Sequence, residues 1–363
     1  MSGLTSRPLY RSLVAGGTQY HRKDATKYEE VEFKIMFTRH SKSCNQETIK
    51  KAIDPALDGV GIDMAIKRGG YIAVSGDERK TKRLYDSDIV LVSCLLRTWQ
   101  TALLLYNPME GPQREVFKLY VYPHLKEHNK VIKTPFGKVE IQRGNYPTEL
   151  KQTLANFLKF LKFIKETCTP YYNNLPGRII IMIPWIKKNI NPSTPYKPSE
   201  LDKDLKFTLI KSGDDGNFKI NIDGNHCSEC WDKKNSKMIN PFKDTLTHDG
   251  DLKTFVESIR ALPNENINKF RPNGTVHVVA HSSLMRTYLG EYMEDIEFKE
   301  SNESKSLIRK YDGDSIKDII IKNISKTNMF SFEMGCKRLG TTLNKVYFGV
   351  GFPDNVPDKN RDL

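Results

Sequence analysis

The chain has 363 residues, and its 38% hydrophobic and 28% charged content with a mean hydropathy of −0.54 predicts a soluble protein with a sizeable core. No stretch approaches the roughly 18 apolar residues of a membrane span, six cysteines do not make a disulfide framework, and no secretory signal is visible, so we expect a cytoplasmic, intracellular protein. The net charge of +13 favours acidic partners, although no run of five basic residues and no clear nucleic-acid-binding motif occurs.

The first predicted elements follow a polar N-terminal arm, which we expect at residues 1–30. Residues 31–38 alternate in hydrophobicity and predict a strand that ends in a Thr-Arg-His-Ser turn. Helical spacing over 59–70 ends in two glycines, which predicts that a helix stops there.

The middle of the chain repeats this order of strand and helix. Residues 88–92 form an apolar run that predicts a buried parallel strand, and a helix with Ser93 as its N-cap is expected over 93–106. The run EVFKLYVYPHLKEHN, residues 115–129, predicts a third strand followed by a polar loop. The strongest amphipathic pattern of the chain, with apolar residues at steps of three and four, predicts a helix over 148–167.

The last third of the chain contains five further predicted elements. A helix is expected over 251–263 and a core strand over 275–280. The helix that follows this strand is expected to be capped by Ser282 or Ser283. Two more strands close the chain, and we expect them to form a hairpin.

Strands that alternate with helices are typical of a three-layer α/β/α sandwich with a mostly parallel central sheet, which we expect over residues 31–363. Residues 170–248 interrupt the alternation, because they are rich in Pro, Asn, Lys and Gly and contain only short β-like runs. We interpret this stretch as an insertion or subdomain with β-hairpin character.

Polar residues of a related chemistry stand at the carboxyl ends of four predicted strands. Arg39 and His40 end the first strand, Arg97 lies in the first turn of the helix after the second, Glu127 follows the third, and His281 ends the later core strand. Ligands of open α/β sheets bind at this edge, so we expect these side chains to converge there. Guanidinium groups match phosphate oxygens, helix N-termini attract anions, and a neutral imidazole is a competent nucleophile, which together predict a phosphate-handling site.

Four short segments, TRHSKSCN, DPALDGVG, SCLLRTWQTA and VVAHSSLMR, together resemble the histidine phosphatase superfamily in its phosphoglycerate mutase-like branch. The first is similar to the family's Arg-His-Gly turn, with Asn45 where an Asn often follows and with Ser41 in the place of Gly, so that Ser41 is expected to adopt the backbone geometry of Gly. The second is similar to an Asp-Pro-x-Leu-Thr-x-x-Gly segment, with Asp58 in the place of Thr. The third matches a Ser-x-Leu-x-Arg-x-x-Gln-Thr-Ala run and is the most specific of the four.

The resemblance implies a role for each of these residues. His40 is implied as the nucleophile that forms a phosphohistidine, Glu127 as the proton donor and His281 as the second catalytic histidine. The residues implied as substrate-binding are Arg39, Arg97, Asn45 and Ser282. Ser282 stands where the acid-phosphatase branch carries its proton-donating Asp, which disfavours that branch, and His124 and His128 flank Glu127 as candidates for substrate contact.

The sequence therefore predicts a metal-independent phosphatase that acts on a phosphorylated small molecule or a phosphoprotein without a cofactor. A phosphoglycerate mutase-type phosphotransferase and a non-catalytic phospho-ligand binding protein on the same fold are the alternatives. His226, Cys227 and Cys230 have the spacing of part of a zinc site, but a single Cys-x-x-Cys pair is a weak signal, and a hairpin turn with free thiols is the expected interpretation. Neither the substrate nor the oligomeric state is predicted.

Overall fold

The computed structural model describes residues 31–44, 54–74, 89–107, 114–122, 125–127, 130–133, 139–142, 150–183, 205–213, 215–221, 255–256, 259, 274–292, 297–298, 329–337 and 340–347. The predicted arm at 1–30, Asn45, His124, His128, the cysteine and histidine cluster at 226–230 and most of the helix predicted over 251–263 lie outside these residues. Within the described part, no helix is long and apolar enough to cross a membrane.

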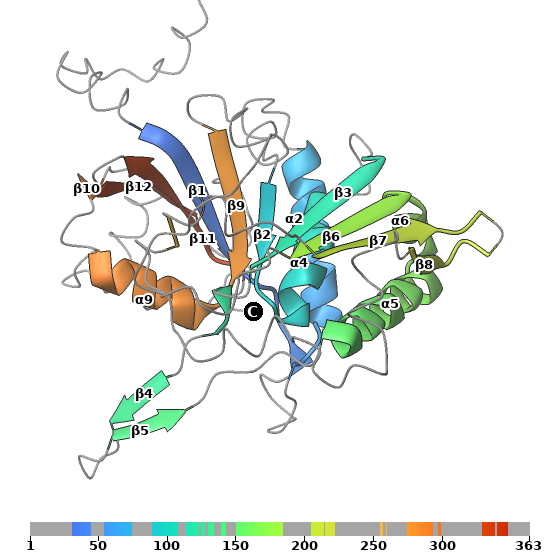
Figure 1. Ribbon diagram of the computed structural model, residues 1–363, viewed down its shortest axis with the longest axis horizontal. Coiled ribbons are helices and arrows are strands. Elements are labelled where there is room, and N and C mark those ends of the chain that lie inside the picture. The colour runs from blue at the N-terminus through green and yellow to red at the C-terminus, as the bar shows by residue number, and fades with distance from the viewer. Residues whose placement is uncertain are drawn as a thin grey trace, which may run out of the picture.

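Ten of the described strands form one mixed sheet (Figure 1). Its centre consists of parallel strands in the order β1 (Val31–Arg39), β9 (Gly274–Ala280), β2 (Ile89–Val92), β3 (Val116–Val121) and β6 (Arg178–Ile183). One flank adds β7 (Leu205–Lys211) and β8 (Phe218–Asn221), and the other adds β11 (Ser331–Lys337), β12 (Gly340–Tyr347) and β10 (Glu297–Phe298). The strands β4 (Lys130–Lys133) and β5 (Val139–Gln142) pair separately. The predicted parallel centre is confirmed.

Helices cover both faces of the sheet, as expected for a three-layer sandwich. Met36 of β1 lies beside His277 of β9, and the ring centroid of His277 is 5.2 Å from that of Tyr106 in α4 (Leu96–Tyr106). The next residue along β1, Phe37, faces the other side, where its ring centroid is 6.0 Å from that of Tyr288 in α9 (Ser282–Tyr292). The helices α2 (Gly59–Val74) and α5 (Leu150–Thr167) pack on the α4 side.

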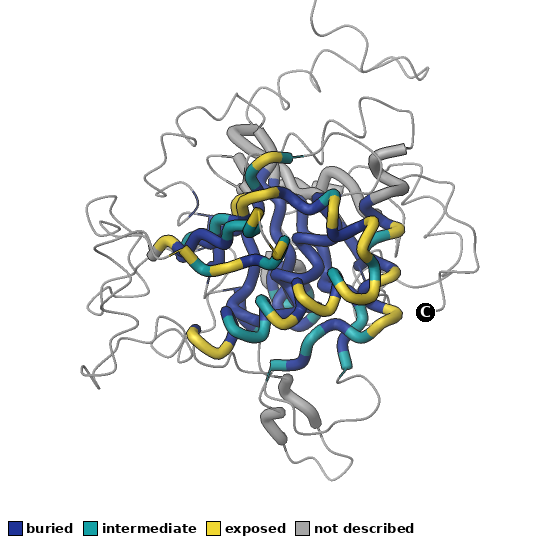
Figure 2. The backbone as a smooth tube through the Cα atoms, turned by 90° about the vertical axis from the view of Figure 1, so that its right-hand side faces the viewer, coloured by how far each residue is buried: buried dark blue, intermediate teal, exposed yellow. Residues whose placement is uncertain are grey.

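The helix α4 is the buried centre of its layer, since every one of its residues is buried. By contrast, α5 is amphipathic and buries Leu154, Phe157, Leu161 and Ile164, at steps of three and four residues, before the chain turns into α6 (Thr169–Asn173). Figure 2 shows the result, with buried strands in the interior and exposed residues on the outer helical surface. Each large apolar side chain buried in this way stabilises the fold by about 1.5–3 kcal/mol.

The helix α2 does not stop at the two glycines, as the sequence predicted, but continues to Val74. The reason lies in the packing of α2 against α4. A Cβ atom at Gly69 would lie 2.8 Å from the carbonyl oxygen of Leu105, so the glycine allows the two helices to approach closely. A glycine that looks like a helix stop in the sequence is a helix-packing residue in the structure.

The start of α4 also differs from the prediction, because the helix begins at Leu96 and Ser93 is not its N-cap. Ser93 Oγ instead accepts the N–H of Leu95 at 3.1 Å. The free N–H of Leu96 is satisfied from a distant segment, since Asp54 Oδ1 accepts it at 3.0 Å. The start of α9 differs in the same way. The helix begins at Ser282, so the residue before it is His281 rather than the predicted Ser282 or Ser283, and the carbonyl oxygen of His281 accepts the N–H of Met285.

In the described part of the stretch 170–248, three strands lie at the short β-like runs noted in the sequence. The strand β6 belongs to the parallel centre, whereas β7 and β8 form the predicted hairpin, whose turn contains Gly216 with a φ of 63°. The described part of this stretch thus continues the main sheet, and its extent as an insertion stays a prediction. The closing hairpin is confirmed by the antiparallel pairing of β11 and β12.

Candidate active site

The carboxyl ends of neighbouring parallel strands lie side by side, which brings distant segments together. The register aligns Arg39 at the end of β1 with Ala280 at the end of β9, and Val92 at the end of β2 with Val279. The N–H of His40 donates to the carbonyl oxygen of Ala280 at 2.9 Å. The residues that follow these strand ends, and therefore meet at one edge of the sheet, are His40, Ser93 and His281.

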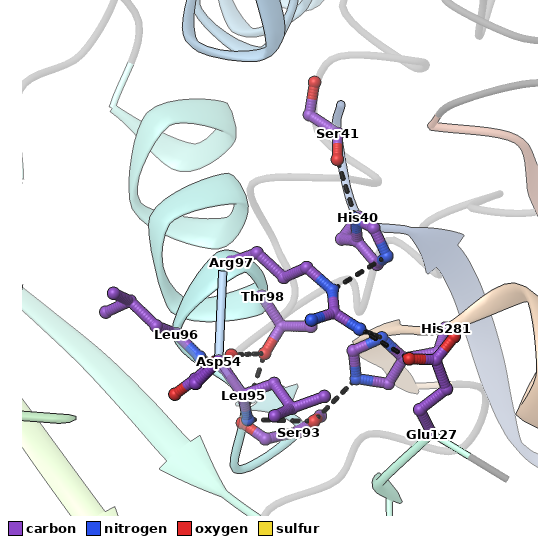
Figure 3. A network of polar contacts seen from close by, with 10 residues as sticks. All are labelled: His40, Ser41, Asp54, Ser93, Leu95, Leu96, Arg97, Thr98, Glu127 and His281. Carbon is purple, nitrogen blue, oxygen red and sulfur yellow. Dashed lines mark hydrogen bonds and ion pairs between the residues drawn. The ribbon is translucent and has the colours of Figure 1, made fainter. Parts of the chain in front are cut away.

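Arg97, in the first turn of α4, connects this edge to the loop after β3 (Figure 3). Its Nε donates to His40 Nε2 at 3.0 Å, and its Nη2 donates to Glu127 Oε2 at 2.8 Å. The same Nη2 lies 3.2 Å from His281 Nδ1, and the ring centroids of the two histidines are 5.1 Å apart. One buried guanidinium therefore contacts both histidines and the carboxylate that sequence reasoning singled out.

The hydrogen-bond partners indicate which nitrogen of each histidine carries a proton. A guanidinium only donates, so His40 Nε2 accepts from Arg97 with its lone pair, while His40 Nδ1 donates to the carbonyl oxygen of Ser41 at 2.6 Å. By the same reasoning His281 Nδ1 accepts from Arg97, and His281 Nε2 donates to Ser93 Oγ at 2.7 Å. The Nε2 lone pair of His40 is thus directed into the group of polar side chains.

The surroundings of His40 favour its neutral form. Burial lowers the pKa of His40 well below its usual value, and the charges of Arg97 and Arg39 lower it further, whereas the hydrogen bond to Ser41 acts in the opposite direction. The imidazole is therefore neutral at physiological pH, with its one proton on Nδ1. A neutral imidazole with an available Nε2 lone pair is the form that attacks phosphorus.

A third arginine belongs to the same electrostatic cluster. Burial lowers the pKa of Arg39 to about 10, Glu127 opposes this shift, and the charges of Arg97 and Arg286 add to it. Arg286 lies on α9, one turn beyond His281, and its Nε donates to the carbonyl oxygen of Ser282 at 3.3 Å. Arg286 was not among the predicted site residues, although it ends the segment VVAHSSLMR; only the start of α9 at Ser282 brings it to this edge.

The turn after His40 does not need a glycine. The N–H of Ser41 donates to Thr101 Oγ1 at 3.0 Å, and Ser41 Oγ donates to the carbonyl oxygen of Gly61 at 2.8 Å. Among the described residues, only Met329 combines a side chain with a positive φ. The expectation that Ser41 adopts a glycine-like backbone is therefore wrong, and its hydroxyl ties the turn to α2 instead.

Polar residues that sequence reasoning did not assign hold the segments of this site in place. Gln100 Oε1 accepts the N–H of Leu57 at 2.8 Å, which joins α4 to the segment before α2. Asp58 Oδ1 accepts the N–H of Gly61 at 2.7 Å and so caps α2, as the Thr of the related motif could also do. Both residues lie in segments that carry the family resemblance, which was the signal available in the sequence.

The remaining predicted residues divide into two groups. Ser282 is half-buried at the start of α9, and its implied role in substrate binding stays a prediction. Asn45 lies outside the described residues, so its predicted role in substrate binding stays a prediction. In the part of the chain that the structure describes, no group of three His, Cys, Asp or Glu side chains is arranged to hold a metal ion.

Replacing Gly61 by alanine is expected to destabilise the protein, because the new Cβ would lie 2.0 Å from the carbonyl oxygen of Lys42, in the turn after His40. Since that backbone has to move, we expect a loss of about 1–3 kcal/mol in the free energy of unfolding, together with reduced activity. Gly59→Ala is the matched control, since nothing lies within 4 Å of its Cβ position. Denaturant unfolding of both variants checks the prediction, and equal stability of the two would contradict it.

Stability is expected to fall below pH 6.5, because burial lowers the pKa of His277 and of His40 in the folded protein. His277, bonded to Thr38 and Tyr106, has its pKa lowered to about 3 by burial, and the pKa of His40 is also lowered. Below the unfolded-state histidine pKa of about 6.5, the unfolded chain binds more protons than the folded protein does. Each of the two histidines therefore lowers the free energy of unfolding by up to about 1.4 kcal/mol for each pH unit of acidification. Denaturant unfolding between pH 7 and 5 measures this slope, and His277→Gln should reduce it by one histidine's share. A slope that His277→Gln leaves unchanged would contradict this explanation.

Comparison with known proteins finds similarity only to solved structures, since no family model and no curated protein sequence matches the chain. A putative alpha-ribazole-5'-P phosphatase from Escherichia coli is 11% identical, with 88% of this chain and 99% of that chain covered and a TM-score of 0.31. A phosphoserine phosphatase mutant from Entamoeba histolytica, in complex with phosphoserine, is 14% identical, with 86% and 96% covered and a TM-score of 0.30. Phosphoglycerate mutase from Bacillus anthracis is 12% identical, with 89% and 96% covered and a TM-score of 0.32.

These neighbours are phosphatases and a mutase. Because the TM-scores are near 0.3 and the sequence identities are below 15%, this structural similarity does not decide what the chain does. The case for a function therefore rests on the residues at the carboxyl edge of the sheet.

Proposed function

We propose that this protein is a phosphatase that hydrolyses a phosphomonoester through a phosphohistidine on His40. The observation that carries the proposal is the placement of the His40 Nε2 lone pair, 3.0 Å from Arg97 Nε and opposite an Nδ1–H that is held by the Ser41 carbonyl oxygen. Guanidinium groups bind phosphate oxygens and keep their charge, so Arg97 brings a phosphoryl group to the nucleophilic nitrogen. Arg39 and Arg286 add positive charge around it.

In the first step, the lone pair of His40 Nε2 attacks phosphorus while the bond from phosphorus to the ester oxygen breaks. Glu127, in its protonated form, gives its proton to the leaving oxygen, so that an alcohol departs. The bond from Nδ1–H to the Ser41 carbonyl oxygen stabilises the positive charge that develops on the ring. Arg97 and His281 hold the phosphoryl oxygens, where negative charge is spread in the transition state.

In the second step, water attacks the phosphorus of the phosphohistidine and loses a proton to the Glu127 carboxylate. The bond between phosphorus and nitrogen breaks, its electron pair returns to His40 Nε2, and inorganic phosphate is released. Each of these steps uses groups of the chain and water alone. A second hydroxyl compound in place of water would accept the phosphoryl group instead, which is the mutase alternative and is distinguished by its product.

Glu127→Gln is expected to separate good from poor leaving groups, because the amide cannot donate the carboxyl proton. We expect kcat/KM, which reports the first step, to fall by about 10²–10⁴-fold for an alkyl phosphate such as glycerol phosphate, but far less for p-nitrophenyl phosphate, whose leaving group needs no proton. Release of inorganic phosphate in excess chelator measures both. Glu166→Gln is the control, since that carboxylate lies on the exposed side of α5. An equal loss for both substrates would contradict the proposed role of Glu127.

A further inference from the structure

Arg97 contacts both His40 and Glu127, and the proposed reaction needs each of them without that contact. Its Nε donates to the His40 Nε2 lone pair at 3.0 Å, and its Nη2 forms an ion pair with Glu127 Oε2 at 2.8 Å (Figure 3). Attack on phosphorus requires that this lone pair be free, and protonation of the leaving group requires that Glu127 carry a proton. The structure instead pairs a carboxylate oxygen of Glu127 with the guanidinium.

A phosphoryl group and the Glu127 carboxylate compete for the same hydrogen-bond donors of Arg97. Both present anionic oxygens that accept from a guanidinium, and Arg97 Nη2 is committed to Glu127 and His281. Arg97 Nη1 is buried and has no hydrogen-bond partner among the described residues. An entering anion can therefore bond Nη1 directly but obtains Nη2 only by displacing Glu127 or His281, and Glu127 is the one of the two that carries anionic oxygens.

Building on the proposed function, we propose that Glu127 is an internal competitor of the substrate for Arg97, and that anion binding releases it with the uptake of one proton. The exchange is balanced: the Arg97–Glu127 ion pair, a dianion and one proton from solvent give an Arg97–dianion pair and a neutral Glu127 carboxyl group. The proton taken up on binding is the one later given to the leaving oxygen. Binding of the substrate thus supplies the acid with its proton before the leaving oxygen needs it.

The charges at this edge support the exchange. The positive charges of Arg97 and Arg286 both act on Arg39, and the Glu127 carboxylate acts on it in the opposite direction. A second negative charge beside an ionised Glu127 would be repelled, which favours protonation of the carboxylate when a dianion binds. The charged and titratable groups around Glu127 in the described residues are Arg97 from α4, Arg39 and His40 from the end of β1, His281 and Arg286 from the β9–α9 junction, and Lys126 beside it in the chain. His128, next in the sequence, lies outside the described residues.

Sulfate is the suitable probe, because it remains a dianion throughout the pH range 5.5–8 and is not turned over. Isothermal titration calorimetry in buffers of different ionisation enthalpy gives both the affinity and the number of protons taken up. For the wild type we expect uptake of about one proton and, accordingly, an affinity about tenfold weaker for each unit of rising pH. Glu127→Gln should bind sulfate about tenfold more tightly or better at pH 7.5 and lose the pH dependence.

Two controls make the outcomes decisive. The first is Glu166→Gln, which removes an exposed carboxylate of α5 and should leave the sulfate affinity unchanged. The second is the pH dependence of sulfate binding by the wild type, which can be measured whether or not a variant folds. Wild-type binding without proton uptake, or a pH dependence that persists in Glu127→Gln, would overturn the exchange while leaving the proposed phosphatase function untouched. Absence of sulfate binding in both proteins would remove the anion site and overturn both proposals.

Discussion

Replacement of His40 by alanine is expected to lower kcat/KM for phosphomonoester hydrolysis by about 10⁴-fold or more, since the variant lacks the imidazole that we propose forms the covalent phosphoryl intermediate. The reason is geometric. The His40 Nε2 lone pair faces Arg97 Nε at 3.0 Å, while the opposite nitrogen, Nδ1, donates to the Ser41 carbonyl oxygen, so the nucleophilic nitrogen points at the guanidinium proposed to bind the phosphoryl oxygens.

A matched variant separates this chemistry from a general effect of removing a buried histidine. His277 is also buried, on the neighbouring strand β9, but its ring bonds to Thr38 and Tyr106, away from Arg97 and Glu127. We expect His277→Gln to keep most of the wild-type kcat/KM. Steady-state assays of both variants, with thermal melts to confirm folding, give the comparison. Comparable losses in the two variants would refute the nucleophilic role of His40.

Arg97→Lys is expected to lower kcat/KM by about 10²–10³-fold, although the charge is kept, because an ammonium group is a single point that cannot reproduce the guanidinium fork. Arg97 contacts His40, Glu127 and His281 through two of its nitrogens. A lysine that neutralises a phosphoryl group leaves at least one of these contacts unmade. Arg97→Ala should lose more, since the charge also disappears.

The control for this substitution is Arg178→Lys, because Arg178 is exposed at the start of β6 and belongs to no part of the site. Kinetics against one aryl phosphate, together with sulfate affinity, measure both variants. We expect Arg178→Lys to behave as wild type and Arg97→Lys to lose both turnover and affinity. Wild-type kcat/KM in Arg97→Lys would mean that positive charge alone, without hydrogen-bond geometry, is what the site requires.

The central strands and the site edge were predictable from the sequence, because both depend on local patterns. The run at 88–92 is apolar throughout, as a strand buried on both faces must be, and the polar residues that end each such run had to meet at one edge. Arg39, His40, Arg97, Glu127 and His281 were found in this way, and the structure brings them together.

The parts that were missed depend on contacts between distant segments. The two glycines of α2 look like a stop signal, yet Gly69 lies against α4, and no local pattern shows that a second helix will cross there. Ser93 looks like an N-cap, but its Oγ accepts hydrogen bonds from the N–H of Leu95 and from His281 Nε2. The N–H of Leu96, at the start of α4, donates instead to Asp54, which lies in another segment. Arg286 required the geometry of α9, and its part in the cluster follows from the structure alone.

The most direct test of the proposed chemistry is to trap the covalent intermediate. Wild-type protein and Glu127→Gln, which lacks the base for the second step, are mixed with p-nitrophenyl phosphate, quenched in alkali and digested, and the modified peptide is identified by mass spectrometry. We expect a phosphoryl group on His40, present in larger amount in Glu127→Gln than in the wild type. Turnover with no phosphorylated histidine, or with the phosphoryl group on another residue, would contradict the proposed mechanism.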